Sequence, residues 1–443
     1  MDLLGDIGSA DQLTSAREEN RVLKKRVDDL TARVKELSVE NEALKAEVEI
    51  YRNEAAMTGF SKLALGKADA MDEDNAGHSG DDFVTGGNGM YSADPAATLP
   101  RLHGYANPLC CTLHSDDSIL ATGGADAYLS FCRWGAALAP FDGAADGVVK
   151  EAARVRCDGP VICADFAREG RGTALRVAAA GCMDGSVKLV EYGPGVGGAA
   201  GLGARALLPS NPIKHKKYVK CLAWSLSAPI LASASADGTV ELIQVGRPTG
   251  SGEVQVERLQ SMHLPGPVEA MCFLDRGEQL VCYARDTPYL SYFDMTDGYK
   301  QTKYNVNSEV KGFEDHVSFA IMHLVPSPDG KYLAAATDTS RNIIFEAGSS
   351  KQIRNLYGHK NDGFSQPKIA WSSSGQYLFG NTQEDSSVCV WDIASASIVR
   401  RLDGSVGGHT SQIRDITSSP ISDTLVTASY DKTIKVWLCS MES

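Results

Sequence analysis

The chain has 443 residues, of which 43% are hydrophobic and 22% charged, a balance typical of a folded protein. Its net charge of -13 argues against direct nucleic-acid binding, which normally requires a basic surface. No long apolar run or N-terminal apolar leader occurs, so we expect no membrane span and no secretory signal.

The 11 cysteines include no Cys-x-x-Cys pair, and most alternate with apolar neighbours. Free cysteines of this kind behave as small buried hydrophobes. We therefore expect a cytoplasmic protein with reduced thiols, with cytoskeleton-associated or nuclear locations as alternatives.

Residues 11–57 are predicted to form one long helix that pairs as a parallel two-stranded coiled coil. Valine at heptad position a and leucine at position d favour two strands, and Asn41 at position a would fix the register of the two helices. The predicted dimerisation residues are Leu23, Val27, Leu30, Val34, Leu37, Asn41, Leu44, Val48 and Tyr51. A solitary amphipathic helix and a heterodimer with another chain are the alternatives.

Residues 58–96 are expected to form an acidic, flexible linker. Acidic residues between Asp69 and Asp82 lie among Ala, Gly and Ser, with few large apolar side chains. Such a segment cannot bury enough surface to offset its ordering entropy. A short docking motif at Phe83 and Val84 is the alternative to a plain tether.

Residues 97–443 contain seven copies of one pattern: an apolar run, an aspartate in a tight turn, and a second apolar run. The spacing falls from 58 residues (Asp126 to Asp184) to 46 (Asp385 to Asp431), close to the roughly 40–50 of blade-type repeats. The turn aspartates are Asp126, Asp184, Asp237, Asp286, Asp338, Asp385 and Asp431. Short strands with turn signals and no helical period predict an all-β seven-bladed propeller behind the N-terminal coiled coil.

The repeats resemble the WD-repeat family, whose signature is Gly-His, a strand, the turn aspartate and then tryptophan. Gly408-His409 followed by Asp431 and Trp437 matches it. The resemblance implies that a histidine, a serine or threonine, the aspartate and the tryptophan form a hydrogen-bonded tetrad that stabilises each blade. The expected members are His409, Thr427, Asp431 and Trp437; His359, Asp385 and Trp391; His215, Ser233 and Asp237; and His103, Thr122 and Asp126.

Several blades depart from that signature. Cys132 and Ile243 stand in the tryptophan place of blades 1 and 3, and Asn381 replaces the serine or threonine of blade 6. Blades 2, 4 and 5 are degenerate. Because the chain runs only from Trp437 to Ser443 after the last signature, family topology implies that a segment near Ala97 to Leu102 supplies the outer strand of the last blade and removes an open edge.

The sequence gives little support for a catalytic, cofactor or metal site. Gly193-x-Gly195-x-x-Gly198 opens no helix that would bind a pyrophosphate, and we interpret it as an inter-blade loop. Cys110 and Cys111 would point to opposite faces of a strand, which disfavours a shared metal. No Ser, His and Asp set lies outside the expected tetrads, so we expect no catalytic, cofactor or metal site.

Function is then expected on a surface. The family's partners usually dock on the face that carries the turn aspartates and the loops before the innermost strands. Candidate docking residues are Met183, Tyr218, Arg285, Phe364, Glu384, Tyr430, Lys216 and Lys217. The lysines suit an acidic peptide or a phosphate, with a solvated loop as the alternative.

We predict a non-catalytic scaffold that dimerises through its coiled coil and docks proteins or peptides on the propeller face. A multi-subunit cytoskeletal, ciliary or trafficking assembly would gain avidity from such a dimer. The alternatives are a substrate receptor of a ubiquitin ligase and a reader of chromatin or histone peptides. The stretch Trp391-Asp392-Ile393-Ala394 lacks the arginine of the Trp-Asp-x-Arg motif of ligase receptors, which weakens the first alternative.

Overall fold

The computed structural model describes residues 89–116, 118–133, 152–168, 176–199, 201–209, 211–246, 253–274, 277–307, 319–361, 366–404 and 407–441, together with Arg21, residues 23–25, Val27 and Lys35. Internal contacts divide the chain into two units, Met1–Asp82 and Phe83–Ser443. In the part that the structure describes, no helix is long and apolar enough to cross a membrane.

The described residues of the first unit are helical. Leu23 and Val27 belong to the predicted dimer seam, and they expose 58% and 59% of their surface. The other seam residues lie outside the described residues: Leu30, Val34, Leu37, Asn41, Leu44, Val48 and Tyr51. The coiled coil therefore stays a prediction.

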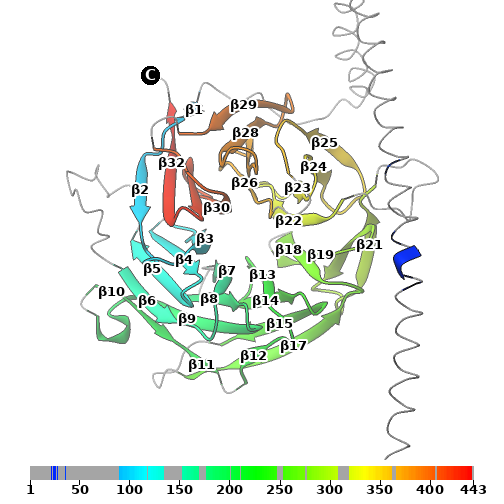
Figure 1. Ribbon diagram of the computed structural model, residues 1–443. Coiled ribbons are helices and arrows are strands. Elements are labelled where there is room, and N and C mark those ends of the chain that lie inside the picture. The colour runs from blue at the N-terminus through cyan, green and yellow to red at the C-terminus, as the bar shows by residue number, and fades with distance from the viewer. Residues whose placement is uncertain are drawn as a thin grey trace, which may run out of the picture. The chain divides into compact units, whose positions relative to one another are not determined.

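The second unit is a ring of seven antiparallel blades, each with its first strand nearest the centre (Figure 1). The innermost strands of blades 1 to 7 are β3 (Pro108–Leu113), β7 (Val161–Phe166), β13 (Val219–Trp224), β18 (Val268–Leu274), β22 (Ile321–Pro326), β26 (Ile369–Trp371) and β30 (Ile413–Ser418). This arrangement confirms the predicted all-β seven-bladed propeller.

The remaining strands follow outward in chain order. They are β4 (Ile119–Gly124), β5 (Tyr128–Arg133) and β6 (Ala152–Arg156) in blade 1; β8 (Val177–Cys182), β9 (Ser186–Pro194) and β10 (Leu202–Ala206) in blade 2; β14 (Ile230–Ser235), β15 (Thr239–Val245) and β17 (Val256–His263) in blade 3; β19 (Gln279–Ala284), β20 (Tyr289–Asp294) and β21 (Gln301–Asn305) in blade 4; β23 (Tyr332–Thr337), β24 (Asn342–Glu346) and β25 (Gln352–Leu356) in blade 5; β27 (Tyr377–Asn381), β28 (Val388–Asp392) and β29 (Ser397–Leu402) in blade 6; and β31 (Thr424–Ser429) and β32 (Thr433–Met441) in blade 7. Short strands β11 (Leu208–Pro209) and β16 (Glu253–Val254) pair in parallel, and β12 (Ile213–Lys214) joins β9.

The core lies between the blades. Among the described residues, seven hydrophobic clusters each join two neighbouring blades around the ring. The second strand of a blade packs against both neighbours, and β4, β8 and β31 are buried along their whole length. The sequences of such strands are continuous runs of small or apolar residues, without the alternation of polar and apolar residues.

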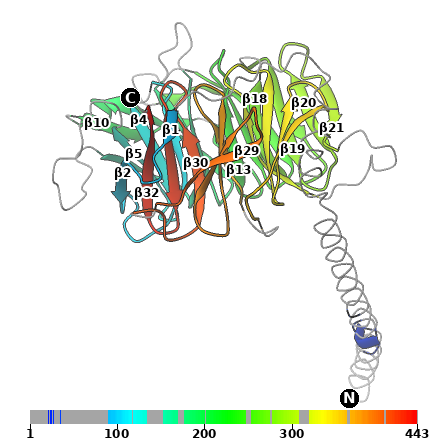
Figure 2. The same ribbon diagram turned by 90° about the horizontal axis from the view of Figure 1, so that it is seen from above.

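Two N-terminal strands close the ring. Strand β2 (Ala97–Pro100) pairs with β32, with Leu99 opposite Ile434, and β1 (Gly89–Tyr91) pairs further along β32. Figure 2 shows these three strands side by side at the edge of the disc. The closing segment lies where the sequence analysis expected it, but β1 falls within the range 58–96 assigned to the linker. The side chain of Tyr91 explains this correction, because it is buried and packs edge-on against Phe379 of blade 6 at 4.8 Å.

Two chemical motifs occupy ordinary structural positions. The run from Gly193 to Gly198 turns between β9 and β10, so it lies within blade 2 and not between blades as we interpreted it. Cys110 and Cys111 point to opposite neighbours, since their thiols donate to the carbonyl oxygens of Val161 in blade 2 and Val426 in blade 7. In the described part of the chain, no group of three or more His, Cys, Asp or Glu residues is arranged to hold a metal ion.

Candidate functional site

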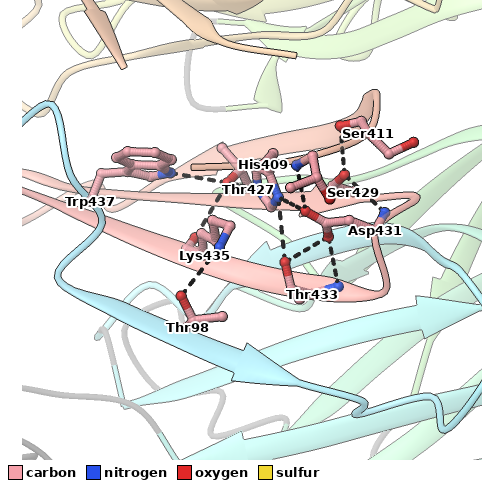
Figure 3. A network of polar contacts seen from close by, with 10 residues as sticks. Thr98, His409, Ser411, Thr427, Ser429, Asp431, Thr433, Lys435 and Trp437 are labelled. Atoms are coloured by element: carbon pink, nitrogen blue, oxygen red, sulfur yellow. Dashed lines mark hydrogen bonds and ion pairs between the residues drawn. The ribbon is translucent and has the colours of Figure 1, made fainter. Parts of the chain in front are cut away.

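The tetrad of blade 7 fixes the turn between β31 and β32 (Figure 3). His409 Nδ1 lies 2.8 Å from Asp431 Oδ2, and His409 Nε2 lies 2.7 Å from the Thr427 hydroxyl. The indole N–H of Trp437 donates to the same hydroxyl oxygen at 3.0 Å. Burial alone would raise the pKa of Asp431, but hydrogen bonds from His409 and Thr433 lower it below its usual range. Burial lowers the pKa of His409, so the imidazole is neutral, donates to the carboxylate and accepts from the hydroxyl.

Blade 1 has three of the four tetrad residues and two of the three contacts. His103 Nδ1 lies 2.9 Å from Asp126 Oδ1, and His103 Nε2 lies 3.0 Å from the Thr122 hydroxyl. Cys132 stands in the tryptophan place, and its thiol donates instead to the carbonyl of Leu120.

In blade 3 a threonine separates the expected partners. His215 Nε2 contacts the Ser233 hydroxyl at 2.8 Å, but Nδ1 contacts the hydroxyl of Thr239 at 2.8 Å. Asp237 Oδ2 lies 3.9 Å from Nδ1, beyond hydrogen-bond distance, and Asp237 instead accepts from Thr239 and from the backbone N–H of Lys216.

The expected tetrad of blade 6 does not form. Neither ring nitrogen of His359 has a hydrogen-bond partner among the described residues, and its ring packs edge-on against Trp391 at 5.1 Å. Trp391 donates to the carbonyl of Tyr357 at 2.8 Å, and Asp385 accepts from Ser387. The structure therefore corrects the assignment of these three residues to a hydrogen-bonded set.

The strand register gives the physical reason. Leu378 pairs with Trp391, so Gly380, two positions further on, holds the place of the serine or threonine. The same count in blade 7 leads to Thr427. We had assigned that place to Asn381. Glycine has no hydroxyl, so the histidine of this blade has nothing to accept from or donate to at that point.

A repeated backbone hydrogen bond places the turns beside the loops that enter the innermost strands. In blades 1, 2, 3, 4 and 7 the residue before the turn aspartate donates its N–H to such a loop. The pairs are Ala125 to Asn107, Met183 to Pro160, Ala236 to Tyr218, Arg285 to Pro267 and Tyr430 to Gln412, at 2.9 to 3.1 Å. These turns and loops form one side of the disc, which we call the turn face.

Most of the predicted docking residues lie on the turn face. Met183, Tyr218 and Tyr430 expose 56%, 38% and 37% of their surface. Lys216 and Lys217 are also exposed, in the loop before β13. Large side chains held on hydrogen-bonded turns lose little entropy on binding, which suits a docking surface.

Two predicted docking residues are engaged in ion pairs, and one cannot be placed. Glu384 accepts from Lys360 Nζ at 2.6 Å, and both side chains are exposed. Arg285 Nε lies 2.9 Å from Glu269 Oε1. Phe364 lies outside the described residues.

A channel runs between the innermost strands. It holds a cavity of about 310 Å³, within the range of ligand pockets, and residues of all seven innermost strands or their ends line it. Lys220, Glu269 and Lys368 line its end near the turn face, which we call the channel mouth, and Asp165 and Arg168 line the other end.

Paired charges occupy the channel mouth, and sequence reasoning missed most of them. The buried Glu269 bridges Lys220 of blade 3 and Arg285 of blade 4. Asp415 of blade 7 lies 3.6 Å from Lys368 Nζ of blade 6. Lys220 and Glu269, and Lys368 and Asp415, come from different blades, so the ring geometry brings these two pairs together.

The family model "WD domain, G-beta repeat" matches residues 210–243, 350–392 and 400–437. These segments cover the regular parts of blades 3, 6 and 7. Together with the seven-bladed ring and the tetrad of blade 7, this match decides the family. The chain belongs to the WD-repeat family. The WD-repeat fold is typically non-catalytic and presents surfaces for protein–protein interaction.

Curated relatives match parts of this WD-repeat chain. "DDB1- and CUL4-associated factor 10" of Xenopus tropicalis is 26% identical over 121 residues, 27% of this chain and 24% of that protein. "Transcriptional corepressor LEUNIG_HOMOLOG" of Arabidopsis thaliana is 21% identical over 265 residues, 52% of this chain and 31% of that protein. "Protein hir1" of Schizosaccharomyces pombe is 31% identical over 132 residues, 26% of this chain and 13% of that protein. The chain therefore spans less than a third of the length of each of these relatives.

Proposed function

We propose that this WD-repeat protein is a non-catalytic scaffold that docks partner proteins or peptides on the turn face. The observation that carries the proposal is the group of exposed large side chains, Met183, Tyr218 and Tyr430, on turns that backbone hydrogen bonds hold in place. Aromatic and methionine side chains are enriched at the centres of protein interfaces. The exposed Lys216 and Lys217 favour a partner with acidic character.

The coiled coil would join two such propellers in the cytoplasm. Support comes from the heptads of residues 11–57 and from Leu23 and Val27, which expose their apolar side chains in a single chain. Two linked propellers bind a repeated target with avidity, so we propose a place in a cytoskeletal, ciliary or trafficking assembly.

The test compares the two faces of the propeller. The partner is identified by cross-linking to the full chain in cells, and its affinity is then measured with purified proteins. Met183→Glu combined with Tyr430→Glu should weaken binding at least about tenfold, since it places charges in an apolar contact. Ile421→Glu is the matched control, because Ile421 is 65% exposed in the β30–β31 turn on the opposite face. Equal effects of both variants would contradict docking on the turn face.

A second function is favoured by the comparisons. Similarity to "DDB1- and CUL4-associated factor 10" and to "Protein hir1" over about a quarter of the chain supports a ubiquitin-ligase substrate receptor or a chromatin reader. Recovery of ligase subunits or of histones in the same cross-linking experiment would favour one of these over a cytoskeletal or trafficking assembly.

A further inference from the structure

We propose that Cys157 and Cys182 form an oxidation site, at which hydrogen peroxide oxidises Cys182 and Cys157 then closes a reversible disulfide between blades 1 and 2. The inference goes beyond the proposed docking function and does not depend on it. It starts from two buried thiols that neither belong to a tetrad nor line the channel.

The alternation of side chains along two strands brings the two cysteines together. Alternate residues of β6 and β8 face each other across the seam between blades 1 and 2. The two rows are Ala153, Val155 and Cys157 from blade 1, and Ala178, Ala180 and Cys182 from blade 2, and all six lie in one buried cluster. Cys157 directly follows β6, and Cys182 is the last residue of β8. The two cysteines are therefore the members of each row that lie nearest the turn face.

Backbone and ionic contacts hold the loop after β6 against the turn after β8. The N–H of Met183 donates to the carbonyl of Pro160 at 2.9 Å. Lys188 Nζ lies 3.4 Å from Asp158 Oδ2, which joins the second blade to the same loop. The two segments that carry the cysteines are thus fixed side by side, as a disulfide between them requires.

Hydrogen bonds to the sulfur of Cys182 favour its thiolate. The hydrogen bond from the Cys157 thiol lowers the pKa of Cys182, burial raises it, and hydrogen bonds from the Ser186 hydroxyl and the Gly159 N–H lower it. The Ser186 hydroxyl is shared, because it also donates to Asp184 Oδ1 at 2.6 Å. The pKa of Cys182 lies below its usual value as a result.

This pair differs from the remaining thiols. Donation to Cys182, together with burial, raises the pKa of Cys157, so the proton of the pair stays on Cys157. Burial raises the pKa of every other cysteine that the structure describes, for example to about 12 at Cys132 and Cys221 and to about 11 at Cys389. Since the thiolate is the form that reacts with peroxide, Cys182 should react first.

The pair lies one residue below the surface of the turn face. Cys157 exposes 4% of its surface and Cys182 exposes 0%. Their neighbours in the chain, Asp158 on one side and Met183 and Asp184 on the other, are exposed. Hydrogen peroxide is small and uncharged, so a local opening of the loop after β6 admits it.

The reaction balances with one molecule of peroxide. The Cys182 thiolate attacks one peroxide oxygen, the O–O bond breaks, and the departing hydroxide takes up the proton that Cys182 had lost. The Cys157 sulfur then attacks the sulfur of the resulting sulfenic acid, the S–O bond breaks, and the Cys157 proton leaves with that hydroxide as water. Two thiols and one peroxide give one disulfide and two waters. A dithiol reductant restores the thiols, as expected of a transient disulfide in a reducing compartment.

The first experiment maps disulfides in the full-length protein. The reduced protein is treated with hydrogen peroxide, its remaining thiols are alkylated in denaturant, and tryptic peptides are analysed without reduction by mass spectrometry. We expect a link between peptides 157–168 and 177–188, with Cys163 of the first peptide still alkylated and full reversal by dithiothreitol. No link, a link through Cys163, or equal yields of links between other cysteines would overturn the inference.

The second experiment separates the roles of the two cysteines. Cys157→Ser should leave the sulfenic acid of Cys182 without a partner, so dimedone should label it, whereas Cys182→Ser should show neither the label nor the link. Cys389→Ser is the matched control, because it removes a buried thiol of blade 6 and should leave the link at its wild-type yield. Dimedone labelling of Cys157 in the Cys182→Ser protein would contradict the order of the two steps.

Circular dichroism checks that each variant is folded, and an alanine variant replaces any serine variant that is not. The wild-type protein decides the inference without any substitution. Its link should form in the folded protein and be lost when urea unfolds the chain before peroxide is added, because unfolding separates the two thiols. A link that forms only in urea would assign it to the unfolded chain and contradict the site.

Discussion

Replacing Thr427 by valine tests how much the tetrad stabilises the propeller. The hydroxyl is fully buried, contacts His409 Nε2 at 2.7 Å and accepts the indole N–H of Trp437 at 3.0 Å. Valine has nearly the same volume, so the change removes two hydrogen bonds without a cavity. Each buried group left without a partner costs about 1–3 kcal/mol, which gives about 2–6 kcal/mol before relaxation.

Blade 6 shows how far the structure relaxes. There Gly380 stands at the position of the hydroxyl-bearing residue, and the indole N–H of Trp391 donates to the carbonyl of Tyr357 instead. A similar rearrangement recovers part of the loss, so we expect Thr427→Val to lower the free energy of unfolding by about 2–4 kcal/mol.

The assay is urea unfolding followed by tryptophan fluorescence and circular dichroism, which must agree for a two-state analysis. Thr302→Val, on the exposed outer strand β21, is the matched control and should change stability by less than about 0.5 kcal/mol. A Thr427→Val variant within 0.5 kcal/mol of wild type would refute the reasoning about the tetrad.

Three further predictions concern pH, ring closure and oligomeric state. Burial, helped by the charge of Arg401, lowers the pKa of His359 to about 4. The free energy of unfolding should therefore fall by about 3 kcal/mol from this residue as the pH drops from about 6.5 to 4. His359→Gln should remove that part of the pH dependence. An equal pH dependence in both proteins would contradict this. A chain that starts at residue 89 should melt like the full-length protein in circular dichroism. A chain that starts at residue 101 lacks β1 and β2 and should lose its cooperative transition. Similar melting of both chains would show that ring closure is dispensable. Leu23→Lys with Val27→Lys should convert a dimer to a monomer in light scattering, and an unchanged mass would argue against the coiled coil.

The blade pattern was predictable because each blade repeats a short local signal. The turn aspartates lie in hairpins between consecutive strands, and the intervals between them suffice for a count of seven. Ring closure by the segment near Ala97 to Leu102 was an implication of the family topology. The three-residue strand β1 was missed because Gly-Met-Tyr has no periodicity. Tyr91 is buried in a cluster with residues of blades 6 and 7, Phe379 among them.

Blade 6 shows how a one-residue change in a turn misleads sequence reasoning. Asp385 lies seven positions after Leu378, whereas Asp431 lies six after Leu425. Counting back from Asp385 therefore led to Asn381, while the strand pairing points to Gly380. Only the register, which is a contact between strands, resolves such a shift.

The channel mouth lay beyond sequence reasoning for a different reason. Two of its ion pairs join separate blades: Lys220 with Glu269, and Lys368 with Asp415 at 3.6 Å. Nε and Nη1 of Arg414 are buried without a hydrogen-bond partner among the described residues. A sequence pattern cannot show that a side chain lacks hydrogen-bond partners.

The central claim is that partners dock on the turn face. Mapping lysine cross-links between the full chain and its partner tests it most directly, because each side of the disc carries lysines. Lys216, Lys217 and Lys360 lie on the turn face, and Lys300, Lys331 and Lys351 lie in turns on the opposite side. The account predicts partner cross-links at the first three and few at the others. A partner cross-linked mainly to the second set would contradict it.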